Sequence, residues 1–205
     1  MNYGAHELLE MTEALRTKAA EIEQHGIFAN QCQDQRLKAI LIKHQQQMMS
    51  AYQQGISLLQ GRGVSVPHQA PVFHNQQAQM GVNSQNQSTM SQPALHPQTL
   101  SEHTIATLAL NTHKSGSVMG MMWANECADP QLRMYHVNGA NLCQEMAFEI
   151  WTWMNQNGYY QPPTFAPQQT SQLSSMFQPT TFPTGAMTNP NMSQTMNQGF
   201  NQHMQ

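Results

Sequence analysis

A ten-residue stretch that occurs twice constrains the fold of this chain more than any other feature. The sequence FANQCQDQRL at 28–37 returns as WANECADPQL at 123–132, a displacement of 95 positions. Ala, Asn, Cys, Asp and Leu keep identical spacing, and both copies open with a large aromatic residue. Self-similarity at a fixed spacing indicates the architecture before any local pattern does.

The same displacement holds on both sides of this stretch. Without a gap it pairs Glu7 with Glu102 and Gly63 with Gly158. Identical residues also fall at 12 and 107, 14 and 109, 15 and 110, and 17 and 112. The chain is therefore an internal duplication of a unit that runs from about 7 to 63 and again from 102 to 158.

The distribution of charge marks the limits of the two copies. Lys, Arg, Asp and Glu make up only 9% of the 205 residues, against about 25% in ordinary globular proteins. All of them lie within 7–62 or 102–149. We therefore expect a helical hairpin at 1–61, a Gln/Pro-rich linker at 62–100, a second hairpin at 101–160 and an uncharged Gln/Asn/Pro/Met-rich tail at 161–205. The low-complexity composition of the linker and the tail predicts that both are disordered.

The first copy has the pattern of two helices joined by a short turn. Apolar residues recur at three-to-four spacing from about 5 to 24, beginning with Leu8 and including Ile22. The pair His25-Gly26 is a plausible end for this helix. Asp34 is placed to cap the next helix, which the glycines at 61 and 63 would end.

The second copy repeats this pattern with clearer signals. Ser101 precedes an amphipathic stretch, and Asp129 is followed by Pro130, a pair typical of an N-cap and a first helical position. Gly158 would end the last helix. Asp34 and Asp129 are therefore predicted to cap the return helix of each hairpin.

Two hairpins bury each other's apolar faces best as an all-α four-helix bundle. A linker of about forty residues allows either an up-down order or a ferritin-like crossover, which must travel one helix length, about 40 Å. Cys32 and Cys127 discriminate between the two orders. Both hairpin turns lie at one end of an up-down bundle, whereas they lie at opposite ends of a crossover bundle.

Several function classes lack any support in the sequence. The formal net charge of −3 provides no basic surface for nucleic acid. We see no secretory signal at the amino terminus, and no apolar run approaches the roughly 20 residues that span a bilayer. No P-loop, dinucleotide fingerprint or nucleophile–base signature is present. We therefore expect a non-enzyme without a cofactor.

A bundle of this length invites comparison with di-iron proteins, which carry Glu-x-x-His on two helices. That motif occurs nowhere in this sequence. His6 and Glu10 could share a helix face, and His44 and His136 could point inward. We interpret these as ordinary polar or core residues and expect no metal site.

The three cysteines and a tyrosine pair are the remaining candidates for chemistry. Cys32 and Cys127 fit small apolar residues packed at the hairpin turns, or alternatively sites of oxidative cross-linking in an assembly, and Cys143 is a further candidate thiol. Tyr159 and Tyr160 fit a hydrophobic clamp that closes the bundle, or alternatively an oxidative cross-linking site. Of these two, we favour the clamp.

Five short motifs resemble the coat F (CotF) family of spore coat proteins from endospore-forming bacteria. They are NYGAHE at 2–7, CQDQ at 32–35, LNTHKSG at 110–116, ECADPQLR at 126–133 and GYYQPP at 158–163. The resemblance covers both helical blocks, about 120 residues, but neither the linker nor the tail. The element ending in QLR followed by GYY is fairly specific, whereas the first block alone would be weak.

The resemblance implies a ferritin-like helical fold and a structural role in the proteinaceous spore coat. It implies synthesis in the mother-cell cytoplasm, location in the coat, and other coat proteins and copies of the same chain as partners, without nucleic acid or membrane insertion. The family offers no catalytic residues to transfer. Two alternatives stay open: a ferritin-like metal-binding oxidase or storage protein, and a soluble coat-assembly factor.

Overall fold

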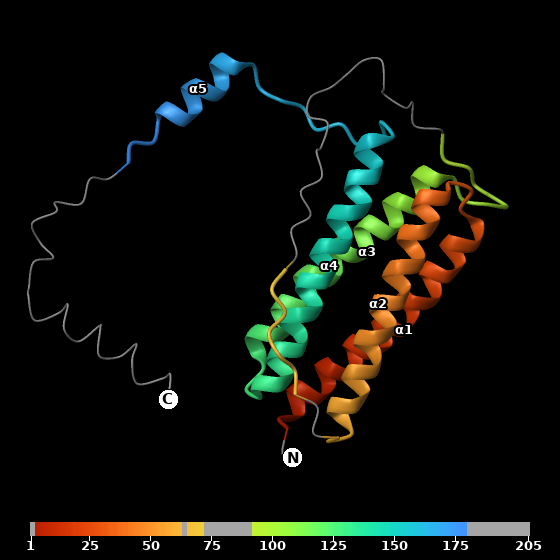
Figure 1. The fold of residues 1–205 in the computed structure, drawn as a ribbon, viewed down its shortest axis with the longest axis vertical. Helices are drawn as coiled ribbons and strands as arrows, with labels where there is room; N and C mark the ends of the chain where they lie inside the picture. Colours follow the sequence, from red (N-terminus) through yellow and green to blue (C-terminus); the bar gives the residue numbers. More distant parts are fainter. Residues whose placement is uncertain (1–2, 63–64, 72–91, 180–205) are drawn as a thin grey trace, which may run out of the picture. The chain divides into compact units, whose positions relative to one another are not determined.

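The computed structural model describes residues 3–62, 65–71 and 92–179, and within these residues the only regular secondary structure is α-helix. The helices are α1 (Ala5–Gln31), α2 (Gln35–Leu59), α3 (Glu102–Glu126), α4 (Pro130–Gln156) and α5 (Pro167–Ser175). The first four lie side by side as a four-helix bundle (Figure 1). The bundle lies within 1–164, and α5 belongs to a separate unit at 165–205.

Polar caps start three of the bundle helices. The carboxylate of Asp34 accepts a hydrogen bond from the Leu37 N–H at 2.7 Å, and the hydroxyl of Ser101 accepts one from the Thr104 N–H. Asp129 accepts from two N–H groups, those of 131 and 132. These bonds satisfy donors that the first helical turn leaves without an intrahelical partner.

The first helix is longer than the sequence predicted, because His25-Gly26 does not end it. Helix α1 continues to Gln31. A Cβ atom on Gly26 would lie 2.8 Å from the side-chain nitrogen of Gln45, which donates a hydrogen bond to the Ile22 carbonyl. The glycine thus gives α2 room to approach α1, and it is no helix stop.

The inward face of α1 also differs from the predicted apolar stripe. Leu8, expected to be buried, is 40% exposed. The buried stripe instead includes Glu7, Lys18 and His25. Hydrophobicity alone could not identify this face, because it includes polar side chains. Glu7 and His25 bond residues of the opposite hairpin, and Lys18 lines a cavity between the hairpins.

The two hairpin turns lie at opposite ends of the bundle. The backbone N–H groups at 33 and 34 donate to Glu102 at the start of α3, whereas those at 128 and 129 donate to Glu7 at the start of α1. Helices α1 and α3 are therefore antiparallel, and the chain returns from the end of α2 along the full bundle before α3 begins. A single long crossover of this kind is the ferritin-like order, so the topology that the sequence left open is settled.

The glutamate contacts obey the displacement of 95 that defines the repeat. Glu7 and Glu102 are equivalent positions, and the turn residues at 33 and 34 are equivalent to those at 128 and 129. Each hairpin therefore contributes a first-turn glutamate that accepts hydrogen bonds from the turn of the other hairpin. The bundle has pseudo-two-fold symmetry, and the duplicated glutamates hold its two ends.

Part of the linker lies against α4. Val66 is buried, its N–H donates to the Gln131 side chain, and the Asn138 amide bonds both Pro67 and Gln69 of the linker. The expected disorder of the rest of the linker at 72–91, and of the tail at 180–205, lies outside the described residues.

The tail is not without structure over its described part. Helix α5 begins with Pro167 at its first turn, and Gln169 accepts a hydrogen bond from the Ala166 N–H. None of its residues is buried. The prediction of a disordered tail was wrong over these nine residues, because a proline start and a local cap can form a helix without a hydrophobic stripe.

The apolar core is concentrated toward the two ends of the bundle. At the end of the first turn it contains Leu37, Ile105 and Trp153, and at the other end Met11, Leu58 and Leu132. A small cluster of Ile22, Met48 and Met146 lies between them. Polar side chains therefore occupy part of the middle of the bundle, and these side chains form the candidate site.

Candidate functional site

Four histidines are buried between the hairpins, and three of them form one cluster. His25 of α1, His44 of α2 and His113 of α3 are each fully buried. Their ring centroids lie 4.9 Å apart for His25–His113, 5.0 Å for His44–His113 and 6.3 Å for His25–His44. One ring nitrogen from each lies within 4.8 Å of the others.

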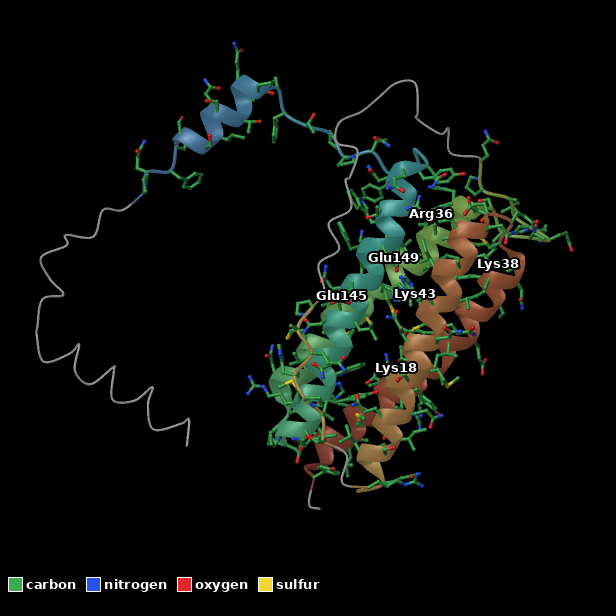
Figure 2. The ribbon with its side chains drawn as sticks, in the orientation of Figure 1. Lys18, Arg36, Lys38, Lys43, Glu145 and Glu149 are labelled. Atoms are coloured by element: carbon green, nitrogen blue, oxygen red, sulfur yellow. The ribbon has the colours of Figure 1, made fainter. Side chains whose placement is uncertain are left out.

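Hydrogen bonds determine which nitrogen carries the proton in two of these rings. The Nδ1–H of His25 donates to the backbone carbonyl of Glu21 at 2.8 Å. The Nε2–H of His44 donates to the carboxylate of Glu149 on α4 at 2.8 Å, and Lys43 pairs with the same carboxylate. Figure 2 shows Lys43 and Glu149 facing each other between α2 and α4. The unprotonated ring nitrogens are therefore Nε2 of His25 and Nδ1 of His44.

His113 completes the cluster. Its Nε2 lies 3.1 Å from Nε2 of His25, so one hydrogen bond joins the two rings. The Nδ1 atoms of His44 and His113 are buried without a hydrogen-bond partner. Buried polar atoms are bonded in the great majority of cases, so two unpartnered nitrogens in one cluster call for an explanation.

The histidines of the interior are neutral at pH 7. Burial lowers the pKa of His25 and of His136 to about 4 and lowers that of His44, and it lowers the pKa of His113 well below the ordinary value. Burial tends to raise the pKa of Glu149, but hydrogen bonds from His44 and Lys43 outweigh it and lower that pKa to about 2. The cluster thus combines three neutral imidazoles with one carboxylate anion.

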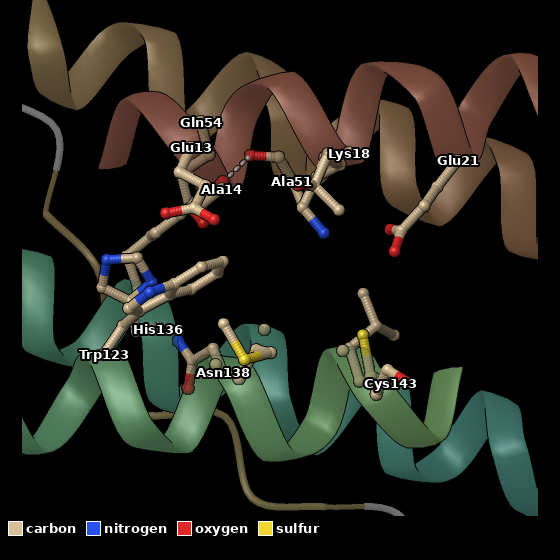
Figure 3. A pocket seen from close by; sticks show the side chains of 18 of the residues that line it. Glu13, Ala14, Lys18, Glu21, Ala51, Gln54, Trp123, His136, Asn138 and Cys143 are labelled. Carbon is tan, nitrogen blue, oxygen red and sulfur yellow. Dashed lines mark hydrogen bonds between the residues drawn. The ribbon is translucent and has the colours of Figure 1, made fainter. Parts of the chain in front are cut away.

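A cavity of about 160 Å³ lies in the other half of the interior. Figure 3 shows Lys18 and Glu21 of α1 directed into it from one side, opposite Asn138 and Cys143 of α4. His136 lines the same cavity, but none of the three clustered histidines does. The cavity exists partly because Gly139 has no side chain, and a Cβ atom there would meet nothing within 4 Å.

The structure places the three cysteines far apart and keeps their thiols protonated. Cys32 is buried at the first turn, where its thiol donates to Glu102 at 2.9 Å, and Cys127 lies at the second turn. Burial raises the pKa of Cys32 to about 12, and of Cys127 and Cys143 to about 11. Because the turns lie at opposite ends, an intramolecular bridge between Cys32 and Cys127 is excluded.

The tyrosine pair follows the end of α4. Tyr159 packs against the core cluster, with its ring centroid 5.6 Å from that of Trp153. Tyr160 is 40% exposed, and the Lys114 ammonium lies 5.6 Å from its ring centroid. The two residues therefore differ, with Tyr159 in a packing position and Tyr160 at the surface.

A second polar group lies near the other turn. His6 contacts Glu10 at 3.0 Å and Glu126 at 2.9 Å, so His6 and Glu10 do share a helix face. Burial and the hydrogen bond to Glu126 raise the pKa of Glu10 to about 6. The hydrogen bond to Glu126 and the charge of Glu10 raise the pKa of His6. His6 and Glu126 of this group are exposed and only Glu10 is buried, whereas all three histidines of the cluster are buried.

Sequence reasoning expected His44 and His136 to point inward, and both are buried, but it missed His25 and His113. The signal was the helical spacing of buried positions at 18, 22, 25 and 29 on α1 and at 106, 109, 110 and 113 on α3. The pair His25-Gly26 resembles a helix stop, so the pattern places His25 outside the buried stripe. His113 lies in a helix whose apolar residues extend too far around to define one face.

Comparisons with known proteins agree with this architecture. Residues 101–163 match the family model of the Coat F domain, which covers α3, α4 and the Tyr159–Tyr160 pair. The chain is 26% identical over 176 residues to YhcQ of Bacillus subtilis (strain 168), described as a spore coat protein F-like protein, with 86% of this chain and 81% of the relative covered.

A solved structure is similar in fold alone. The crystal structure of a conserved hypothetical protein, rv2844, from Mycobacterium tuberculosis superposes with a TM-score of 0.51 at 17% identity. The similarity covers 73% of this chain and 97% of that one. Among the described residues, no helix has the length and apolar character needed to cross a bilayer.

Proposed function

We propose that the chain is a member of the coat F family and a structural, non-catalytic component of the bacterial endospore coat. The match of the family model to the second hairpin carries this proposal, because that hairpin supplies half of a duplicated bundle. The similarity to a relative described as spore coat protein F-like supports it over most of the chain.

The chemistry of the interior supports a structural role. The cavity is lined by side chains from both hairpins, but the clustered histidines lie outside it. The cysteine thiols have raised pKa values and so are weak nucleophiles at neutral pH. These features support a rigid building unit over an enzyme, and they make cysteine cross-linking of the folded chain slow.

Exposed apolar side chains support assembly with other coat proteins or with further copies of this chain. On the bundle, Leu9 is 70% exposed and Val118 is 69% exposed. In the separate unit that contains α5, Met176 and Phe177 are 73% and 80% exposed. Exposed apolar residues in an uncharged, Gln-rich background favour multivalent association over a single tight interface.

Fractionation of sporulating cells tests the proposal. The chain should appear in the insoluble coat fraction of purified spores and should resist extraction by salt, since its contacts are largely uncharged. Recovery only from soluble mother-cell extract would contradict a structural role and favour the soluble assembly factor. Mass spectrometry of the same coats would show whether glutamines of this chain are joined to lysines.

A further inference from the structure

The histidine cluster has a chemical character that packing alone does not explain. Three helices each contribute one imidazole to a fully buried point, and the fourth contributes Glu149, which bonds one of the three. Two ring nitrogens, Nδ1 of His44 and Nδ1 of His113, are left without any partner in the protein. Three apolar side chains would fill the same space without leaving any buried polar atom unpartnered.

The groups around the rings have the arrangement that orients metal-bound histidines in proteins. A metal-binding histidine usually donates its other ring N–H to a carboxylate or to a backbone carbonyl. His44 donates to the Glu149 carboxylate, and His25 donates to the Glu21 carbonyl, both at 2.8 Å. Each bond fixes the tautomer and leaves the opposite nitrogen unprotonated.

We propose that His25, His44 and His113 form a buried binding site for one divalent first-row transition-metal ion of the zinc class. Imidazole nitrogens suit Zn²⁺, Cu²⁺, Ni²⁺ and iron, whereas Mg²⁺ and Ca²⁺ require oxygen ligands that the cluster does not provide. His113 can use either ring nitrogen, because its Nε2 contacts only another member of the cluster and its Nδ1 has no partner.

The spacing of the rings suits this ion. Metal–nitrogen bonds of about 2.0–2.1 Å in a tetrahedral site place two ligand nitrogens about 3.4 Å apart. The Nε2 atoms of His25 and His113 are 3.1 Å apart, and the ligand atoms of all three rings lie within 4.8 Å of one another. The nitrogen–nitrogen distances to the third ring thus exceed the tetrahedral spacing by about 1.4 Å at most.

The duplication does not repeat this site in the other half of the bundle. At a displacement of 95, His25 corresponds to Gly120, His44 to Gly139 and His113 to Lys18. Two of the three equivalent positions carry no side chain, and the third carries a cation. The pseudo-symmetric position thus has no ligands, and one ion per chain is the expected stoichiometry.

Cobalt binding by the full chain tests the site. The protein is unfolded in chelator, freed of metal, and refolded with Co²⁺, which has visible absorption bands that report tetrahedral nitrogen coordination. We expect one Co²⁺ per chain after gel filtration, displaced by one equivalent of Zn²⁺. Paramagnetically shifted N–H resonances from three imidazoles should appear in the NMR spectrum of the loaded protein.

Four variants assign the ion to the cluster. His113→Gln should abolish stoichiometric binding, and Glu149→Gln, which removes only the charged partner of His44, should weaken it by about 10–100-fold. His136→Gln alters a buried histidine of the cavity and His6→Gln alters the exposed group, and both should bind as the wild type does. Far-UV circular dichroism checks that each variant is folded.

The contrary results are equally definite. Absence of bound cobalt in the refolded wild type would overturn the proposal, whatever the variants do. So would full occupancy in folded His113→Gln, or loss of binding in His6→Gln, which would move the ion to the exposed group. The wild-type NMR count of imidazole resonances decides the matter even if His113→Gln does not fold. None of these outcomes affects the placement of the chain in the coat.

Discussion

The two halves of the bundle interior occupy equivalent positions in a duplicated chain, yet they differ in chemistry. In one half, His25, His44 and His113 pack together, and Glu149 bonds His44. In the other half, the equivalent positions are Gly120, Gly139, Lys18 and Gln54. All four of these line the cavity that Figure 3 shows.

The two ends of the bundle, by contrast, make equivalent hydrogen bonds. Glu7 and Glu102 each cap the turn of the other hairpin, and Asp34 and Asp129 each cap a return helix. A frame held by identical contacts at both ends tolerates change in its middle. The difference shows that the capping contacts at the two ends can be the same while the interior side chains of the two halves differ. Four predictions test whether the ends and the interior contribute independently to stability.

The largest expected effect is a loss of stability in acid. The folded pKa of His25 and of His136 is about 4, below the ordinary 6.5, so the unfolded chain binds more protons between these values. The free energy of unfolding should therefore fall as the pH falls from 6.5 to 4, by about 3 kcal/mol for each of these two residues. His44 and His113, whose pKa values are also lowered, add to the loss.

Urea unfolding at pH 7.5, 6, 5 and 4.5 measures this effect. Glu10, whose pKa is raised to about 6, contributes stability in the opposite sense, present in acid and lost as the pH rises through 6. His136→Leu should remove only the part of the pH dependence that comes from His136, which lines the cavity. Most of the pH dependence of the unfolding free energy should therefore remain in that variant. Equal stability at pH 7.5 and 4.5 would refute the buried neutral state of the cluster.

A matched pair of substitutions compares the two halves directly. Glu149→Leu leaves the Nε2–H of His44 and the ammonium of Lys43 without their shared acceptor, and it should cost about 2–3 kcal/mol of unfolding free energy. Gln54→Leu, at the equivalent position beside the cavity, should change stability by less than about 0.5 kcal/mol. Chemical denaturation of both variants checks the difference, and equal costs would mean that the halves are not energetically distinct.

The ends should respond equally to the loss of their glutamates. Glu7→Ala removes the acceptor of the N–H groups at 4, 128 and 129, and Glu102→Ala removes the acceptor of those at 33 and 34. We expect each to cost about 1.5–2 kcal/mol, because charged acceptors at helix starts are lost. Thermal unfolding would show similar decreases in Tm. A cost confined to one end would break the pseudo-symmetry of the frame.

The smallest expected effect separates two glycines of the cavity half. Gly139→Ala should stabilise the chain by about 0.5–1 kcal/mol, because a Cβ atom meets nothing within 4 Å and alanine favours the helix. Gly120→Ala should destabilise it by about 1 kcal/mol or more, because the added atom would lie 3.2 Å from the backbone nitrogen of Ala140. Opposite signs in urea titrations would confirm that the interior is open at one glycine and tightly packed at the other.

Much of the frame was accessible from sequence patterns. The displacement of 95 identified the duplication, and Asp34, Ser101, Asp129 and Gly158 marked where helices begin or end. The same patterns misplaced the end of α1, because a glycine that admits Gln45 of α2 resembles a helix stop. They also predicted that Leu8 is buried and did not identify Glu7 as buried, since a carboxylate that bonds a distant turn has no local signature.

The sequence by itself determined the number of bundle helices, the pairing of the hairpins and the relation between the two copies. These depend on local propensity, capping and an internal repeat, which are all properties of neighbouring residues. Only the tertiary structure decided the crossover order and the meeting of His25, His44 and His113, which lie up to 88 positions apart. Such contacts depend on how whole helices pack, and a helix can be turned or reversed without any change in its local pattern.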